Sequence, residues 1–255
     1  MGGPLSGTRL VLTRAAEDCD EWRVEFEALG AEVIAAPCVR FEARRSDSLG
    51  EAIARRGDFA AVAFTSARAA RFFAEQSDVP VETWNDKLIA SVGRRTSAEL
   101  ERLGFDVGLE ATDSNALGLA RAISSHGLAP RSQVLLPQSE RARPVLAREL
   151  KEAGLRPFVA PIYTTVPSDS SALKSLRTFS DDLSFTVLVF ASPSAFDAFR
   201  EIGGELASRL LTDPELRVLA IGKTTETAIV DAGFSVPLRA ESPNAQGIAA
   251  VLPRT

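Results

Sequence analysis

The sequence contains two copies of one pattern, and this internal repeat restricts the possible folds more than any other feature. An offset of 124 positions places Gly30 on Gly154 and Ala36-Pro37 on Ala160-Pro161. Further matches, at offsets of 126 to 129 positions, are Phe64-Thr65-Ser66 with Phe190-Ala191-Ser192, Gly93 with Gly222, Gly104-Phe105 with Gly233-Phe234, Asn115-Ala116 with Asn244-Ala245, and Gly118 with Gly247. Such a run of coincidences is hard to obtain by chance, so we interpret the chain as a duplicated unit.

Short apolar runs alternate with helical patterns throughout, which is typical of parallel sheets with helices on both faces. We expect an α/β fold of two flavodoxin-like domains, each with a five-stranded sheet. The strands of one domain are predicted near 10–13, 33–37, 186–191, 217–221 and 235–239, and those of the other near 60–65, 87–92, 106–109, 133–137 and 157–161. Helices are predicted at 19–29, closed by Gly30, and at 141–153, closed by Gly154.

The chain is predicted to begin one domain, build the other, and then return. The first domain comprises residues 1–38 and 167–255, and the second comprises residues 42–160. Two interdomain strands, 38–42 and 160–167, join them, and the second carries the only tyrosine, Tyr163. We expect these strands to act as a hinge, with an active site in the cleft beside them.

Composition excludes several classes of function. The net charge of −5 argues against a nucleic-acid-binding protein that works through a general basic surface. Two cysteines, Cys19 and Cys38, and one histidine, His126, do not have the spacing of a metal site. We find no signal peptide and no apolar run that would span a membrane, so we expect a cytoplasmic protein. No coiled-coil pattern or exposed apolar repeat predicts more than a monomer.

Four hydroxyl residues lie at matched places after predicted strands, at the starts of helices: Ser66, Thr96, Ser192 and Thr225. Each can be a plain N-cap, which is the ordinary use of such a residue. Alternatively, the four helix starts bind carboxylate groups, because the first N–H groups of a helix have no internal partner and attract anions. Ser242-Pro243-Asn244 repeats the arrangement and is interpreted as a cap alone.

Basic and amide side chains also follow the strand ends. They are Arg14, Arg68, Arg94, Arg95, Gln138, Arg141, Arg143 and Lys223. Each alone can be a solvated surface residue, but together they can form a positive rim for a polyanionic ligand. The aromatic residues Phe72, Phe73, Phe196 and Phe199 have helical spacing and are predicted to lie in the core. No Walker loop or complete GxGxxG motif indicates a nucleotide site.

Several motifs, in this order and at these distances, resemble the uroporphyrinogen-III synthase family over nearly the whole chain. The motifs are Leu10-Val11-Leu12-Thr13-Arg14, Phe64-Thr65-Ser66, Ser91-Val92-Gly93-Arg94-Arg95-Thr96, Pro161-Ile162-Tyr163, Phe190-Ala191-Ser192-Pro193-Ser194-Ala195, Ala220-Ile221-Gly222-Lys223-Thr224-Thr225 and Ala240-Glu241-Ser242-Pro243. The resemblance implies two flavodoxin-like domains joined by a two-stranded ladder. Two positions depart from the family pattern: Arg68 stands where the family often has Asn, and Gln138-Ser139 where it often has Arg-Gly.

The resemblance also implies a reaction. The family closes hydroxymethylbilane, a linear tetrapyrrole rich in carboxylates, with inversion of ring D, and loses the terminal hydroxyl group. The substrate supplies its own electrons, so no metal or cofactor is implied. By resemblance, Tyr163 assists departure of the hydroxyl, and Ser66, Thr96, Ser192 and Thr225 bind substrate. From their placement we add Arg14, Arg94 and Lys223 as substrate-binding residues.

Two other functions remain open at this stage. The chain can be a synthase-like domain that has lost its activity and serves in regulation, an alternative that Arg68 and Gln138 leave open. It can also be a two-lobed module that closes over a small anionic ligand. A synthase would take its substrate from hydroxymethylbilane synthase, with which a transient handover is conceivable.

Overall fold

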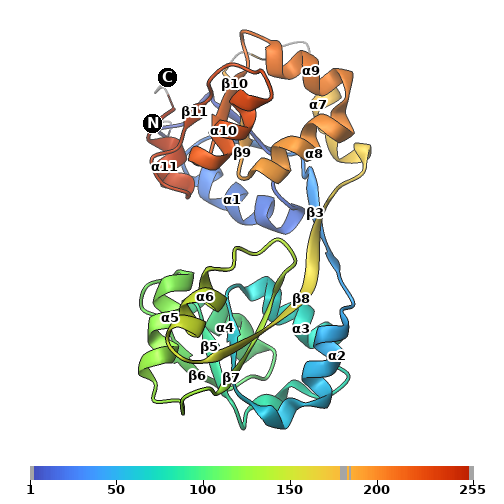
Figure 1. Cartoon of the computed structure of the whole chain (residues 1–255). Helices are drawn as coiled ribbons and strands as arrows, with labels where there is room; N and C mark the ends of the chain where they lie inside the picture. Colours follow the sequence, from blue (N-terminus) through green and yellow to red (C-terminus); the bar gives the residue numbers. More distant parts are fainter. Residues whose placement is uncertain (1–2, 179–182, 184, 253–255) are drawn as a thin grey trace. The chain divides into compact units, whose positions relative to one another are not determined.

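The chain folds into two compact units joined by two strands. The computed structural model describes residues 3–178, 183 and 185–252 (Figure 1). Unit 1 comprises Met1–Phe41 and Thr165–Thr255, and unit 2 comprises Glu42–Thr164. The joining strands are β3 (Val39–Ala43) and β8 (Arg156–Pro167), each of which contains one of the two boundaries. The predicted cleft between the units stays a prediction.

Unit 1 is built on a parallel sheet of five strands. They are β1 (Arg9–Leu12), β2 (Glu32–Ala35), β9 (Thr186–Phe190), β10 (Arg217–Ala220) and β11 (Leu238–Arg239). Their spatial order is β2-β1-β9-β10-β11, and every neighbouring pair is parallel. This is the flavodoxin-like order, in which the sequence of strands reverses between the second and third positions. The predicted fold class is thereby confirmed.

Unit 2 contains a similar sheet with one additional strand. Its members are β4 (Phe59–Phe64), β5 (Leu88–Ser91), β6 (Val107–Glu110), β7 (Gln133–Ser139) and β8, with β3 beside β8 at the edge. The sheet therefore has six strands where five were expected, because the crossover strand β3 uses the free edge of β8 for backbone hydrogen bonds. Without β3 the order is β8-β7-β4-β5-β6.

The two spatial orders are the same when the repeat is applied. The repeat matches β7 with β1, β8 with β2, β4 with β9, β5 with β10, and β6 with β11. Unit 2 is therefore a circular permutation of unit 1, because the last two strands of unit 2 occupy the places of the first two strands of unit 1. The same permutation makes unit 1 discontinuous in sequence and unit 2 continuous.

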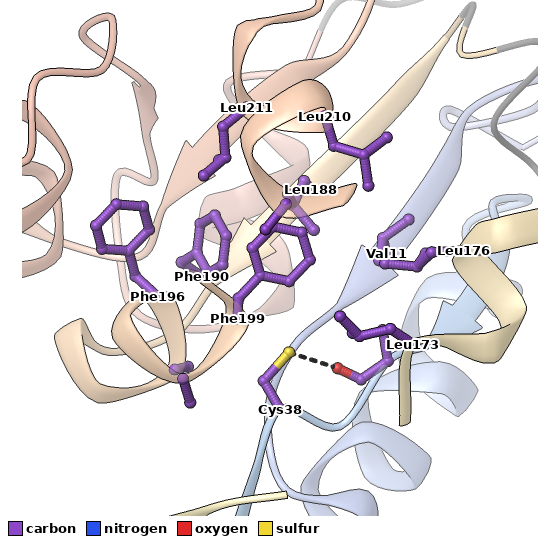
Figure 2. Close-up of a cluster of buried hydrophobic side chains, with 14 of the residues drawn as sticks. Val11, Cys38, Leu173, Leu176, Leu188, Phe190, Phe196, Phe199, Leu210 and Leu211 are labelled. Atoms are coloured by element: carbon purple, nitrogen blue, oxygen red, sulfur yellow. Dashed lines mark hydrogen bonds between the residues drawn. The ribbon is translucent and has the colours of Figure 1, made fainter. Parts of the chain in front are cut away.

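Helices cover both faces of the sheet in unit 1. They are α1 (Ala16–Ala28), α7 (Lys174–Thr178), α8 (Pro193–Gly203), α9 (Glu205–Thr212), α10 (Lys223–Asp231) and α11 (Ala245–Ala249). One core packs α1 and α11 against the sheet, and the other packs α7 to α10 against the opposite face. In the second core, Phe190 of β9 makes edge-to-face contacts with Phe196 and Phe199 of α8, at centroid distances of 5.3 and 5.4 Å (Figure 2).

Unit 2 follows the same plan with α2 (Asp47–Ala54), α3 (Ala67–Gln76), α4 (Arg94–Arg102), α5 (Ala116–Ser125) and α6 (Val145–Glu152). Helix α6 begins four residues later than predicted. Pro144 lies at its N-cap, and a proline disfavours helical geometry in the residue before it. Arg141 and Arg143 therefore lie in the preceding turn. The described residues also form short 3-10 helices, which are η1 (Arg56–Asp58), η2 (Val81–Trp84) and η3 (Ser170–Leu173).

Matched helix starts in the two units share the same hydrogen bond. The Asn115 side chain accepts a bond of 2.9 Å from the backbone N–H of Gly118, and Asn244 accepts one of 2.8 Å from Gly247. Both glycines pack tightly, since a Cβ on Gly118 or on Gly247 would lie 2.3 Å from a backbone oxygen. Both copies of the repeat therefore keep the asparagine cap and the close packing of the glycine against the backbone before the helix.

Two glycine substitutions in unit 2 should have opposite effects on stability. A Cβ on Gly50, within α2, would meet no other atom within 4 Å, so Gly50→Ala should raise the free energy of unfolding by about 0.5–1 kcal/mol. Gly118→Ala should lower it by about 1–3 kcal/mol, because the new methyl group meets the Asp113 carbonyl. Urea unfolding of both variants checks this, and equal effects would contradict the packing described.

Both cysteines should be unreactive in the folded protein. Cys38 donates a hydrogen bond of 3.1 Å to the Ala36 carbonyl within the core (Figure 2), and both thiols are fully buried. Burial raises the pKa of Cys19 to about 12 and raises that of Cys38 as well. Because the thiolate is the reactive form, a thiol reagent should label neither cysteine at neutral pH and both after denaturation. Rapid labelling of the native protein would show that the thiols are accessible.

Candidate functional site

An open cavity of about 250 Å³ lies in unit 1 at the carboxyl ends of β1 and β9. The order of strands reverses between these two, which is where open α/β sheets bind ligands. The Thr13 hydroxyl donates a hydrogen bond of 2.8 Å to the Val189 carbonyl and ties the two strand ends together. The lining residues are Arg14, Ala15, Asp18, Val39, Phe41, Thr165, Ala191, Ser192, Ser194 and Ala195.

Arg14 is the basic residue of this cavity, and two neighbours on α1 hold its guanidinium. Asp18 lies 3.6 Å from Nη2, and the Trp22 ring lies under the guanidinium at 4.1 Å from its centroid. The contact with Asp18 spans one helical turn, and the ring contact is a cation–π interaction. Arg14 is therefore held in place before any ligand arrives, although Asp18 offsets part of its charge. The sequence indicated Arg14 but not the roles of Asp18 and Trp22.

Ser192 caps the second helix that starts at the cavity. Its Oγ accepts a hydrogen bond of 3.1 Å from the backbone N–H of Ala195, and Pro193 occupies the first helical position. In unit 2, Ser66 accepts the same 3.1 Å bond from Ala69 at the start of α3. Both serines are thus N-caps, as the first interpretation predicted.

Thr96 and Thr225 do not cap their helices, so the capping interpretation was wrong for both. The caps of α4 and α10 are Gly93 and Gly222, neither of which makes a side-chain capping bond. The threonines lie within the first turn and are 4% and 2% exposed. Because a glycine cap has no side-chain oxygen, neither N-cap residue bonds to its helix through a side chain. The N–H groups of Thr96 and Thr225 donate instead to the carbonyls of Gly93 and Gly222, at 2.9 and 3.1 Å.

Arg94 and Lys223 occupy the same first helical position in the two units but differ in their contacts. Lys223 donates a hydrogen bond of 2.7 Å to Glu226, which also binds Arg239 at 2.8 Å. The bond from Lys223 lowers the pKa of the Glu226 carboxyl, so this carboxylate is ionised at neutral pH and holds both cations. The Arg94 side chain is exposed and makes no hydrogen bond or ion pair within the described part of the chain. Arg94 is therefore the more available cation.

Tyr163 lies on β8 within unit 2 and is 7% exposed. Its ring stacks on Phe72 of α3, with a centroid distance of 5.0 Å and an interplanar angle of 14°. Tyr163 pairs with Ser139 just after a bulge, so it lies beside the carboxyl end of β7. Phe72 was predicted to lie in the core, as its neighbour Phe73 does. Instead it is half-buried and forms the surface on which Tyr163 rests.

Two further findings bear on the type of site. Among the residues that the structure describes, no three His, Cys, Asp or Glu side chains gather in a way that could hold a metal ion. In those same ranges, no helix has both the length and the apolar character needed to span a bilayer.

A larger cavity of about 760 Å³ lies at the amino-terminal end of β10, beside Arg217 and Phe234. None of the predicted site residues lines it, and parallel sheets bind ligands at the other edge.

Comparison with known proteins agrees with the architecture. The model of the family "Uroporphyrinogen-III synthase HemD" matches residues 20–250. A protein of Methanothermobacter thermautotrophicus described as "Putative uroporphyrinogen-III synthase" is 26% identical over 229 residues, covering 89% of this chain and 90% of that protein.

Two solved structures show the same fold. The uroporphyrinogen-III synthetase of Helicobacter pylori superposes with a TM-score of 0.62 at 16% identity, covering 94% of this chain and 95% of the other. A mutant uroporphyrinogen III synthase of Thermus thermophilus gives a TM-score of 0.52 at 16% identity, with 96% of each chain covered. The match to the family extends over most of the sequence, and this chain therefore belongs to the uroporphyrinogen-III synthase family, whose members are enzymes of tetrapyrrole biosynthesis.

Proposed function

We propose that this protein is an active uroporphyrinogen-III synthase. It takes hydroxymethylbilane, removes the terminal hydroxyl as water, and closes the macrocycle with ring D inverted to give uroporphyrinogen III. In class it is a cyclising hydro-lyase. The proposal rests on family membership, and the residues of the candidate site supply the groups that such a reaction requires.

The cavity between β1 and β9 is the observation that supports this function beyond the family. A guanidinium held by Asp18 and Trp22 and the start of α8 border the same space. Guanidinium groups and helix N-termini both favour carboxylates. Hydroxymethylbilane carries acetate and propionate groups on every ring, so one such group fits this cavity in charge and in size. Arg94 and the glycine-capped helix starts offer further positions of the same kind.

Tyr163 is the proposed proton donor. Its phenol O–H can donate a proton to the departing hydroxyl. Water leaves, and the electron-rich pyrrole becomes an azafulvene, which ring D attacks through its substituted carbon. The resulting spiro intermediate fragments and recloses with ring D inverted. The remaining task of the protein is to fold the chain of four rings and to prevent direct closure to the type I isomer.

The product distinguishes this function from its alternatives. The protein is incubated with freshly made hydroxymethylbilane, the product is oxidised, and the type I and type III uroporphyrins are resolved. An excess of type III over a protein-free control supports the proposal. Formation of type I alone, at the rate of the control, would overturn it and favour a binding or regulatory role.

Tyr163→Phe should slow the reaction without abolishing it. The substitution removes only the hydroxyl and keeps the stacking on Phe72, so folding should be preserved. Loss of one general acid typically costs about 100-fold, and we expect about 10- to 100-fold here because hydroxyl loss from a pyrrole is intrinsically easy. Single-turnover kinetics with isomer analysis measure the effect. A rate near that of the unsubstituted protein would rule out the acid role.

Arg14→Gln should weaken substrate binding more than it slows chemistry. A charge-assisted hydrogen bond to a carboxylate is worth about 1.5–3 kcal/mol, so KM should rise about 10-fold or more while kcat changes little. Arg209→Gln on α9 is the matched control, because Arg209 is exposed and does not line the cavity. An unchanged KM for Arg14→Gln, or equal effects of both substitutions, would exclude carboxylate binding in this cavity.

A further inference from the structure

Tyr163 is held by an unusual set of contacts on its own strand and on the helix beneath it. The Ile162 carbonyl, just before it, accepts hydrogen bonds from the Gln76 side chain at 2.7 Å and from the backbone N–H of Arg44 at 2.9 Å. The Tyr163 carbonyl accepts a bond of 2.9 Å from the backbone N–H of Glu140. Of these contacts, only the one from Gln76 reaches the strand from the helix that carries Phe72.

The orientation of the Gln76 amide is determined by its partners. Its Nε2 lies 2.7 Å from the Ile162 carbonyl and 3.0 Å from the Phe72 carbonyl. Both partners only accept hydrogen bonds, so the NH₂ group must face them. The amide oxygen Oε1 is consequently buried without a hydrogen-bond partner in the described structure. Burying an unpaired carbonyl is unfavourable, so stability alone does not explain a glutamine at this position.

The repeat supplies an internal comparison. Offsets of 124 and 126 positions relate Tyr163, Phe72 and Gln76 to three residues of unit 1, which are Val39, Ala198 and Ile202. Val39 and Ala198 are buried in the apolar core, and Ile202 packs against that core. The duplicated fold is therefore satisfied by aliphatic side chains at all three positions. Unit 2 instead has the phenol of Tyr163, the Phe72 ring that stacks on it, and the Gln76 amide, which bonds to the backbone of both the strand and the helix.

We propose that Gln76 is a positioning residue for Tyr163. The Gln76 amide donates to the Ile162 carbonyl on β8 and to the Phe72 carbonyl on α3. These two bonds hold the strand and the helix at a fixed distance from each other. This sets the stacking of the two rings and the direction of the phenol. The inference rests on the proposed function for its importance to catalysis, but the positioning itself is a property of the folded protein.

Gln76→Met is the appropriate substitution. Methionine has nearly the same length and shape but cannot donate a hydrogen bond. The Ile162 carbonyl keeps the bond from Arg44, and the Phe72 carbonyl keeps its helical partner, so no carbonyl is left unpaired. Gln76→Ile, which introduces the residue found at the matched position of unit 1, is measured beside it.

The tyrosine itself provides the measurement. Since the protein contains a single tyrosine, nitration with tetranitromethane gives one nitrotyrosine signal without any need for assignment. Tyr163 is buried and should react slowly in the unsubstituted protein. If Gln76 holds the stack closed, nitration should be about fivefold faster in both variants, the change expected for loss of one buried hydrogen bond. Ile123→Val, in α5 within an apolar cluster that contains neither Gln76 nor Phe72, is the control for a general loss of stability.

Each outcome decides the proposal. Faster nitration in the Gln76 variants alone supports it. Unchanged nitration, or an equal increase in Ile123→Val, would overturn it. Failure of both Gln76 variants to fold would also overturn it, because Gln76 would then serve the fold and not the orientation of Tyr163.

Activity assays add a separate reading. With hydroxymethylbilane, the Gln76 variants should show a kcat about fivefold lower and an unchanged KM, because substrate binding is not touched. A raised KM with unchanged kcat would contradict positioning of the proton donor. If the unsubstituted protein forms no type III product, the proposed function fails, but the nitration result still decides whether Gln76 positions Tyr163.

Discussion

The structure depends on strands that are buried on both of their faces. All five side chains of β9 are buried, and five of six are in β4. Such strands require cover on two sides, and parallel strands provide it because each connection between them carries a helix over one face. Parallel order then places the start of each helix that directly follows a parallel strand, such as α1, α3 and α8, at the carboxyl edge of its sheet. The candidate site is a consequence of this arrangement, because Arg14, Ser192 and Ser66 all follow strand ends.

The repeat explains why so much of the fold could be predicted. It showed which segments occupy equivalent places, and alternating strands and helices then indicated parallel sheets. The serine caps were predictable because serine before a helical run, and proline after it at Pro193, have few other uses. Three features could not be read from the sequence. A glycine cap has no side chain that would mark it in the sequence, so capping by Thr96 and Thr225 was one of the two interpretations considered. Trp22 holds Arg14 through a cation–π contact, and no characteristic spacing in the sequence indicates such a contact. Phe72 has the helical spacing of a core residue. Only its equivalent in unit 1, the buried Ala198, shows that this position in the fold does not require an aromatic side chain.

The two units use equivalent positions for different chemistry. An offset of 129 positions matches Ser97 with Glu226 and Glu110 with Arg239. Each pair bonds in its own unit: the Ser97 hydroxyl donates to the Glu110 carboxylate, and the Arg239 guanidinium donates to the Glu226 carboxylate. The link between a helix and the next strand end is thus retained while its charges differ. As a result, one helix start has an engaged lysine and the other an arginine available to a ligand.

The circular permutation has a consequence for how the chain is made. β1 pairs with β9, and their first paired residues, Arg9 and Thr186, are 177 positions apart. At usual rates of translation, β1 waits roughly 10–35 seconds for this neighbour. All strands of the unit 2 sheet, including the edge strand β3, emerge in one uninterrupted stretch during that interval. We expect unit 2 to fold on the ribosome first, while the segment with apolar β1 and β2 remains without the rest of its sheet. The order of synthesis therefore exposes β1 and β2 to chaperones and to misassembly for longer than the strands of unit 2.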